Sequence, residues 1–67
     1  MDKVTINGED RLLDGPVILK DLLETIGFGV KWVLVERNGE AVMREDYTTT
    51  TIEPGDRLEI ATPMAGG

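Results

Sequence analysis

The stretch Leu19-Lys20-Asp21-Leu22-Leu23-Glu24-Thr25-Ile26-Gly27 decides the fold of this 67-residue chain. Its apolar residues recur at i, i+3, i+4 and i+7, a spacing that gives a helix one hydrophobic face. The charged residues Lys20, Asp21 and Glu24 fall on the other side, and Gly27 is a natural stop. The start is marked less clearly, because the preceding residue is neither Ser nor Thr. The pattern predicts one amphipathic helix, which must bury its apolar face against another element.

Extended segments are predicted before this helix. Val4 and Ile6 alternate with polar residues, which is the period-two pattern of a half-buried strand, and Asn7-Gly8 is a strong hairpin signal. Leu12-Leu13 then fits a second short strand, which Asp14-Gly15-Pro16 ends. The N-terminal part of the chain therefore predicts a β-hairpin.

The segment after the helix, from Trp32 to Val35, is apolar and partly β-branched, so it predicts a strand. Val33 and Val35 would share one face of that strand. Trp32 and Leu34 would lie on the other face, where they either pack against a second layer or dock a partner. Apolar residues on both faces indicate an interior strand, or a strand whose outer face meets a partner.

The C-terminal half adds further extended segments. Asn38-Gly39 is a second hairpin signal and leads into Ala41-Val42. The threonine run at residues 48–51 favours extended structure. Pro54-Gly55-Asp56 predicts a turn, and the alternating segment from Arg57 to Ile60 predicts the last strand.

The order of elements is therefore β-β-α-β-β, with room for an extra turn before the last strand. One helix must cover one face of the sheet, because so small a sheet is unstable alone. The prediction is an α+β β-grasp (ubiquitin-like) fold with a mixed four- to five-stranded sheet, one main helix and a central last strand. Most Leu, Ile and Val residues are expected in its core. We expect one β-grasp domain over residues 1–62 and a flexible C-terminal tail over residues 63–67.

Composition excludes several classes of function. The chain has no Cys and no His, so the usual nucleophile, general base and soft metal ligands are missing. A net charge of −6 disfavours nucleic acid and anionic membranes. No apolar run approaches the length of about 20 residues that a membrane span needs. We expect a cytoplasmic protein that is not an enzyme, binds no metal and is monomeric when free.

The final residues, Met64-Ala65-Gly66-Gly67, suggest a function for the tail. Glycine has no Cβ, so a Gly-Gly end can enter a passage too narrow for any side chain. A terminal carboxylate on Gly67 could then be activated by another enzyme. The alternative interpretation is an inert tail, because chain ends are often disordered and tolerant of change.

A set of residues spread over the chain forms a joint pattern. It comprises Asp21-Leu22-Leu23-Glu24, Val33-Leu34-Val35-Glu36-Arg37-Asn38-Gly39-Glu40, Arg44, Tyr47, Thr50, Pro54-Gly55-Asp56-Arg57-Leu58-Glu59-Ile60 and Gly66-Gly67. With this pattern the chain resembles the thiamin-biosynthesis sulfur carriers, the ThiS family. It departs from them at Met43, where Pro is usual, and at Ile18, where a Thr or Ser cap is common. Neither departure touches the tail.

The resemblance implies a carrier cycle centred on Gly67. An E1-like adenylating enzyme of the ThiF type would use ATP and Mg²⁺ to convert the Gly67 carboxylate into an acyl adenylate. A persulfide donor would then convert it into a thiocarboxylate, which gives sulfur to a thiazole synthase of the ThiG type. Gly66, Ala65 and Met64 would enter the partner active sites, and the carrier itself would bind no cofactor.

Two other functions remain open at this point. The chain could carry sulfur in another pathway, as the small subunit of molybdopterin synthase does. It could also be a β-grasp interaction module without carrier function. The identity of the sulfur donor, the partner-contact residues and any conjugation to lysines stay open as well.

Overall fold

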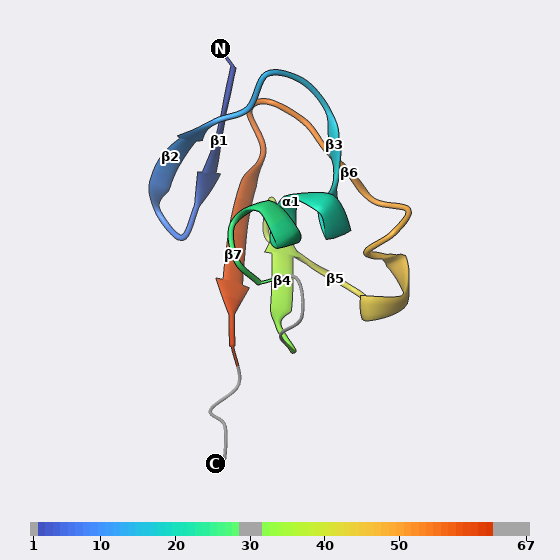
Figure 1. Ribbon diagram of the computed structural model, residues 1–67. Coiled ribbons are helices and arrows are strands. Elements are labelled where there is room, and N and C mark those ends of the chain that lie inside the picture. The colour runs from blue at the N-terminus through green and yellow to red at the C-terminus, as the bar shows by residue number, and fades with distance from the viewer. Residues whose placement is uncertain (1, 29–31, 63–67) are drawn as a thin grey trace.

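The computed structural model describes residues 2–28 and 32–62 of the chain, and a five-stranded sheet forms its centre (Figure 1). The strand order is β2-β1-β7-β4-β5. The strands are β1 (Lys3–Ile6), β2 (Glu9–Leu12), β4 (Leu34–Arg37), β5 (Glu40–Val42) and β7 (Arg57–Ala61). Because β1 and β7 run parallel while the other neighbours run antiparallel, the sheet is mixed. The predicted central position of the last strand is confirmed.

The helix α1 (Leu19–Thr25) lies across one face of this sheet (Figure 1). Ile18 precedes it without a side-chain cap, which agrees with the weak start signal. Gly27 follows with a φ of +99°, a conformation that glycine adopts easily and that ends a helix. The predicted helix is therefore confirmed, with its last apolar residue, Ile26, at the C-cap.

The two Asn-Gly turns form as predicted. Asn7 and Gly8 have φ values of +52° and +85°, and Asn38 and Gly39 have +52° and +89°. Two positive φ angles in a two-residue loop are typical of a type I′ hairpin turn, whose twist matches that of the flanking strands. These turns set the registers of β1 with β2 and of β4 with β5.

The core lies between α1 and the sheet. Its buried residues come from α1, from the strands β1, β4, β7 and Thr51–Ile52, and from the position just before β4: Val4, Ile6, Leu19, Leu22, Leu23, Val33, Val35, Ile52, Leu58 and Ile60. Partly buried residues, among them Val42 and Phe28, pack around this cluster. The helix and the alternating strands thus bury the faces that their periodicities predict.

Some predictions for the irregular segments were wrong. Only the end of the threonine run is extended, in β6 (Thr51–Ile52), because a 3-10 helix η1 (Arg44–Asp46) and turns precede it. Asp46 explains this: its backbone oxygen accepts hydrogen bonds from the hydroxyls of Thr49 and Thr50, a local bonding mode that competes with strand formation. The short strand β3 (Val17–Ile18), which pairs with β6 in a two-stranded sheet, was not predicted.

Leu12 also differs from expectation. It ends the edge strand β2 and is 89% exposed instead of belonging to the core.

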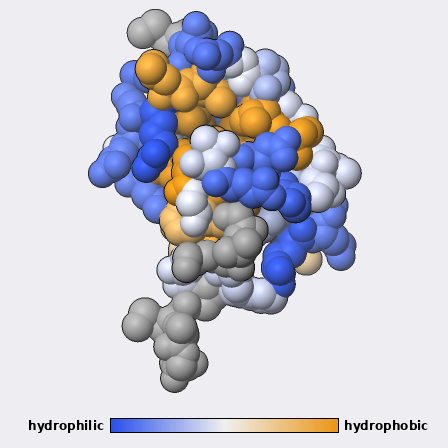
Figure 2. Space-filling model, in the orientation of Figure 1, coloured by the Kyte–Doolittle hydropathy of each residue, from blue (hydrophilic) through white to orange (hydrophobic). Residues whose placement is uncertain are grey.

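Hydrophobic residues are visible between hydrophilic ones on the helix-bearing side of the molecule (Figure 2). Within the described residues, no helix is long and apolar enough to cross a membrane.

Asp56 joins the turn before β7 to the β4–β5 hairpin. Its carboxylate accepts hydrogen bonds from Arg37 Nε (2.9 Å), Asn38 Nδ2 (3.1 Å) and the backbone N–H of Glu53 (2.9 Å). Burial alone would raise the pKa of Asp56, but these bonds and the Arg37 charge outweigh it and hold the pKa below its usual value. The ionised carboxylate therefore stabilises the fold.

We expect Asp56→Asn to lower the free energy of unfolding at pH 7 by about 1–3 kcal/mol, because the charge-assisted bonds of a carboxylate that is only 12% exposed are lost. A depressed pKa stabilises the fold above the unfolded-state value of about 3.9, and this contribution disappears as pH falls through the folded-state pKa. Urea unfolding at pH 7 and pH 3 measures this contribution to the free energy of unfolding. The variant should lose less stability on acidification than the wild type and than the control Asp14→Asn; an equal loss would contradict the assignment.

Candidate functional site

The outer face of the sheet, away from α1, carries the two residues predicted to dock a partner. Trp32 and Leu34 are each 55% exposed, whereas Val33 and Val35 between and beside them are buried. The predicted division of this segment between two faces is thus confirmed, although β4 begins only at Leu34. No second layer of described residues covers Leu34.

An apolar groove surrounds these two side chains. It runs over β4, β5 and the end of β7, and its lining includes Trp32, Leu34, Ala41, Met43 and Ala61. Leu34 lies opposite Ala61 in the β4–β7 ladder, and Met43, 60% exposed, follows β5. We call this surface the outer groove. It lies directly beside the point where β7 ends.

Arg44 orders the rim of the outer groove. Its guanidinium carbon lies 3.7 Å from the centroid of the Trp32 ring, a cation–π contact that holds the indole in place. Arg44 was expected only as part of the family pattern, and its contact with Trp32 was not predicted. No sequence spacing indicates it, because the two residues lie on different segments.

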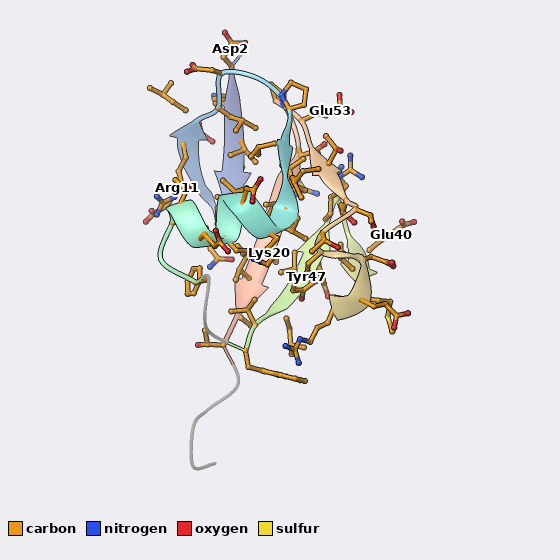
Figure 3. All side chains as sticks on the ribbon, turned by 45° about the vertical axis from the view of Figure 1, so that its right-hand side comes forward. Asp2, Arg11, Lys20, Glu40, Tyr47 and Glu53 are labelled. Atoms are coloured by element: carbon orange, nitrogen blue, oxygen red, sulfur yellow. The ribbon has the colours of Figure 1, made fainter. Side chains whose placement is uncertain are left out.

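Tyr47 supports the same region from inside. It follows η1, and its side chain is seen between the labelled Lys20 and Glu40 in Figure 3. Its hydroxyl donates a 3.0 Å hydrogen bond to the Val33 carbonyl, just before β4. Burial raises the pKa of Tyr47 above its ordinary value, so the hydroxyl stays protonated and remains a donor at neutral pH. Tyr47 thereby fixes the backbone between Trp32 and Leu34.

The lining of the outer groove becomes acidic farther along β4 from Leu34. Glu36 of β4 lies directly opposite Glu59 of β7, and both residues are exposed. Like charges in directly opposed positions destabilise a sheet. A cationic group from a partner would relieve this repulsion, which fits the net charge of −6.

The strand β7 ends at Ala61, next to the outer groove, and the predicted tail follows after Thr62. Gly67, Gly66, Ala65 and Met64, which were predicted as the attachment site and the entering tail, lie outside the described residues. The boundary predicted after residue 62 likewise stays a prediction. What the structure does place is the root of the tail, on the central strand of the sheet.

The acidic side chains of the described residues do not form a metal-binding cluster. Within residues 2–28 and 32–62, no group of three or more metal-ligating side chains gathers in one place. The acidic pair Glu36 and Glu59 stands on an open surface and not in an enclosed pocket. What the described residues do form is an exposed apolar groove beside the end of the central strand.

A family comparison decides which group of proteins this is. A model of the ThiS family matches residues 4–67, which is nearly the whole chain and includes Gly66-Gly67. The chain belongs to the ThiS family. This confirms the resemblance drawn from the sequence pattern.

Relatives with names support the same grouping. The sulfur carrier protein ThiS of Thermus thermophilus is 38% identical over 64 residues, which are 96% of this chain and 98% of that protein. A thiazole synthase of Paramagnetospirillum magneticum is 37% identical over 65 residues, which are 97% of this chain. The chain spans only 20% of the length of that thiazole synthase.

Solved structures of a ThiS-family member show the same fold. The crystal structure of the thiamine biosynthesis protein ThiS from Geobacter metallireducens has a TM-score of 0.81 at 34% identity, covering 97% of this chain and 99% of that one. The solution structure of a thiamine biosynthesis protein from the same organism has a TM-score of 0.78, covering 97% and 87%. The β-grasp fold expected from the sequence is therefore confirmed.

Proposed function

We propose that this protein is a sulfur carrier of thiamin biosynthesis that bears its sulfur on the Gly67 carboxyl group. The observation that carries the proposal is the ThiS-family match, which extends through Gly66-Gly67. The fold supports it, because the tail starts from the central strand beside an exposed apolar groove. In this proposal the protein carries a reactive group and is itself no catalyst.

The proposed chemistry has three steps before sulfur is delivered to the thiazole synthase. A Gly67 carboxylate oxygen attacks the α-phosphate of ATP on an E1-like enzyme of the ThiF type, which releases pyrophosphate and leaves an acyl adenylate. A persulfide sulfur then attacks the Gly67 carbonyl carbon and expels AMP. Reduction of the resulting S–S bond by a thiol leaves a thiocarboxylate, which a thiazole synthase consumes.

The division of labour follows from the residues. A carboxylate is a poor acyl donor until its oxygen becomes part of a good leaving group, and the activating enzyme supplies Mg²⁺ and cationic groups for that phosphate chemistry. The carrier need only supply a reachable carboxylate and binds no cofactor itself. Residues 63–67, when extended, reach at most about 17 Å. That length allows a domain docked at an enzyme surface to present Gly67 in an interior site.

We further propose that the outer groove docks both partners. Trp32 is an aromatic residue of the kind enriched at interface centres, and Leu34 lies beside it. A thiazole synthase that contains a region 37% identical to this chain supports a partnership with that class of enzyme. The opposed Glu36 and Glu59 favour a partner surface that brings a Lys or Arg to this place.

Leu34→Glu is expected to weaken binding to the activating enzyme by about 30-fold or more, because an apolar contact is replaced by a charge in a desolvated interface. Isothermal titration calorimetry with a ThiF-type enzyme measures the affinity. Leu12→Glu is the matched control, since Leu12 is also an exposed leucine but lies on the edge strand β2. Equal weakening by both substitutions, or by neither, would contradict docking at the outer groove.

Mass spectrometry after thiol alkylation tests the carrier function itself. The protein is incubated with a ThiF-type enzyme, MgATP and a persulfide donor, and is then treated with a thiol-selective reagent. Because the chain has no Cys, an ATP-dependent adduct on Gly67 reports a thiocarboxylate. Absence of both adduct and adenylate with a competent enzyme would contradict the proposal and favour a β-grasp module with an inert tail.

The pathway is tested separately. A carrier of the molybdopterin synthase type would also form a thiocarboxylate, so the adduct alone does not separate the two. Purified thiocarboxylate carrier should support thiazole formation by a ThiG-type thiazole synthase with its other substrates. Failure there, together with sulfur transfer by a molybdopterin-type large subunit, would contradict the thiamin assignment.

A further inference from the structure

The side chain of Asn7 makes two hydrogen bonds to the middle of the last strand. Asn7 Nδ2 donates to the Ile60 carbonyl at 3.0 Å, and Asn7 Oδ1 accepts from the Ile60 N–H at 2.7 Å. Asn7 is one of the two turn residues between β1 and β2 and is 53 positions away from Ile60 in the sequence. These contacts are not needed to form the turn, which requires only the two positive φ angles.

The geometry of the ladder explains why Ile60 needs this partner. The N–H and C=O of a strand residue point to the same side, and Ile60 directs both toward β1. The parallel ladder ends with the pair Ile6 and Leu58, and the last backbone bond runs from Asn7 N–H to the Leu58 carbonyl at 2.9 Å. There the chain turns away into the hairpin. The amide of Asn7 therefore takes the place of the strand residue that would otherwise bond to Ile60.

We propose that Asn7 is a positioning residue for the C-terminal tail. Up to Ile60, β7 is hydrogen-bonded on both sides. One side pairs with β4, and on the other side the Asn7 amide bonds to Ile60. Ile60 is the last β7 residue that directs its backbone groups toward β1, and only Ala61 and Thr62 separate it from the tail at residues 63–67. The direction of the chain is thereby fixed at Ile60, three positions before the tail begins.

This role deepens the proposed carrier function and rests on it for its catalytic consequence. If the end of β7 frays, the orientation that can enter a partner active site is populated only part of the time. The apparent affinity for the partner then falls in proportion to that population. Once the tail is bound, its geometry at the reacting carboxylate is unchanged. Loss of the Asn7 amide should therefore raise KM for the carrier and leave kcat nearly constant.

Asn38 provides an internal control. It occupies the same position in the β4–β5 turn, with the same φ of +52°. Its side chain also makes two hydrogen bonds, from Nδ2 to Asp56 Oδ1 at 3.1 Å and from the Arg57 N–H to Oδ1 at 2.9 Å. Asn38 thus holds the first residue of β7, far along the strand from the tail.

The test compares Asn7→Gly with Asn38→Gly, because glycine tolerates the positive φ of both turns and removes only the amide. Both variants should melt at a temperature lower by roughly 5–15 °C. Hydrogen exchange in the free protein should accelerate at the Ile60 and Ala61 amides in Asn7→Gly, and at Arg57 in Asn38→Gly. Steady-state adenylation should show a five- to twentyfold higher KM for Asn7→Gly alone. Asn7→Asp, which keeps the acceptor for the Ile60 N–H, should lie between it and the wild type.

Several outcomes would overturn the inference. Unchanged exchange at Ile60 and Ala61 in Asn7→Gly would show that the amide does not hold this part of β7. Accelerated exchange with an unchanged KM, or an equal rise in KM for Asn38→Gly, would show that it does not position the tail. If the wild-type protein itself is not adenylated, the proposed function fails instead, and the exchange experiment still decides whether Asn7 holds β7.

Discussion

Gly67→Ala is expected to reduce the rate of adenylation by about 100-fold or more, while the thermal melt stays that of the wild type. A Cβ at the reacting residue would displace the carboxylate in a passage shaped for an unbranched chain, and a displacement of about 1 Å costs that much. The fold should be indifferent to the change, because residue 67 lies beyond the last strand, which ends at Ala61.

Pyrophosphate release with a ThiF-type enzyme and MgATP measures this effect. The matched control is Gly15→Ala, the same substitution in the loop before β3, where an added Cβ meets no atom within 4 Å and φ is not in the left-handed region. It should leave both adenylation and melting unchanged. Normal adenylation of Gly67→Ala would refute the argument that the tail must be free of side chains at its end.

Leu22→Ala should have the opposite pattern, with about 2–5 kcal/mol lost from the free energy of unfolding. Leu22 is 6% exposed and packs from α1 into the core of a small domain. Domains of this kind have a total stability of about 5–15 kcal/mol, and small ones lie at the lower end. A large part of the variant could therefore be unfolded at physiological temperature, whereas any protein that remains folded should be adenylated normally.

Urea unfolding of Leu22→Ala and of Leu12→Ala compares the same substitution in two environments. Leu12 is 89% exposed, so its truncation should change the free energy of unfolding by no more than about 0.5 kcal/mol. Similar losses for both variants would contradict the assignment of Leu22 to the core. Thermal melts and adenylation assays of Gly67→Ala and Leu22→Ala together separate the roles of the tail and the domain.

Local patterns in the sequence predicted most elements of the fold. The helix spacing at Leu19, Leu22 and Leu23, the two Asn-Gly turns and the alternation in β1 and β7 depend on neighbours close in the chain. The family pattern and the Gly66-Gly67 ending are also readable without a structure. The threonine run was misread, because Asp46 accepts hydrogen bonds from Thr49 and Thr50 and keeps them in a turn.

The sequence by itself thus determined the one-helix α+β fold, because periodicity and turn chemistry are local, and its joint residue pattern indicated the family and, through the family, the residue proposed to carry sulfur. Only the tertiary structure decided where the outer groove lies, that Arg44 stacks on Trp32, and that Asn7 bonds to Ile60. These contacts join segments that are distant in the chain. They depend on the strand order and on the register of β7 with both of its neighbours, which no local pattern encodes.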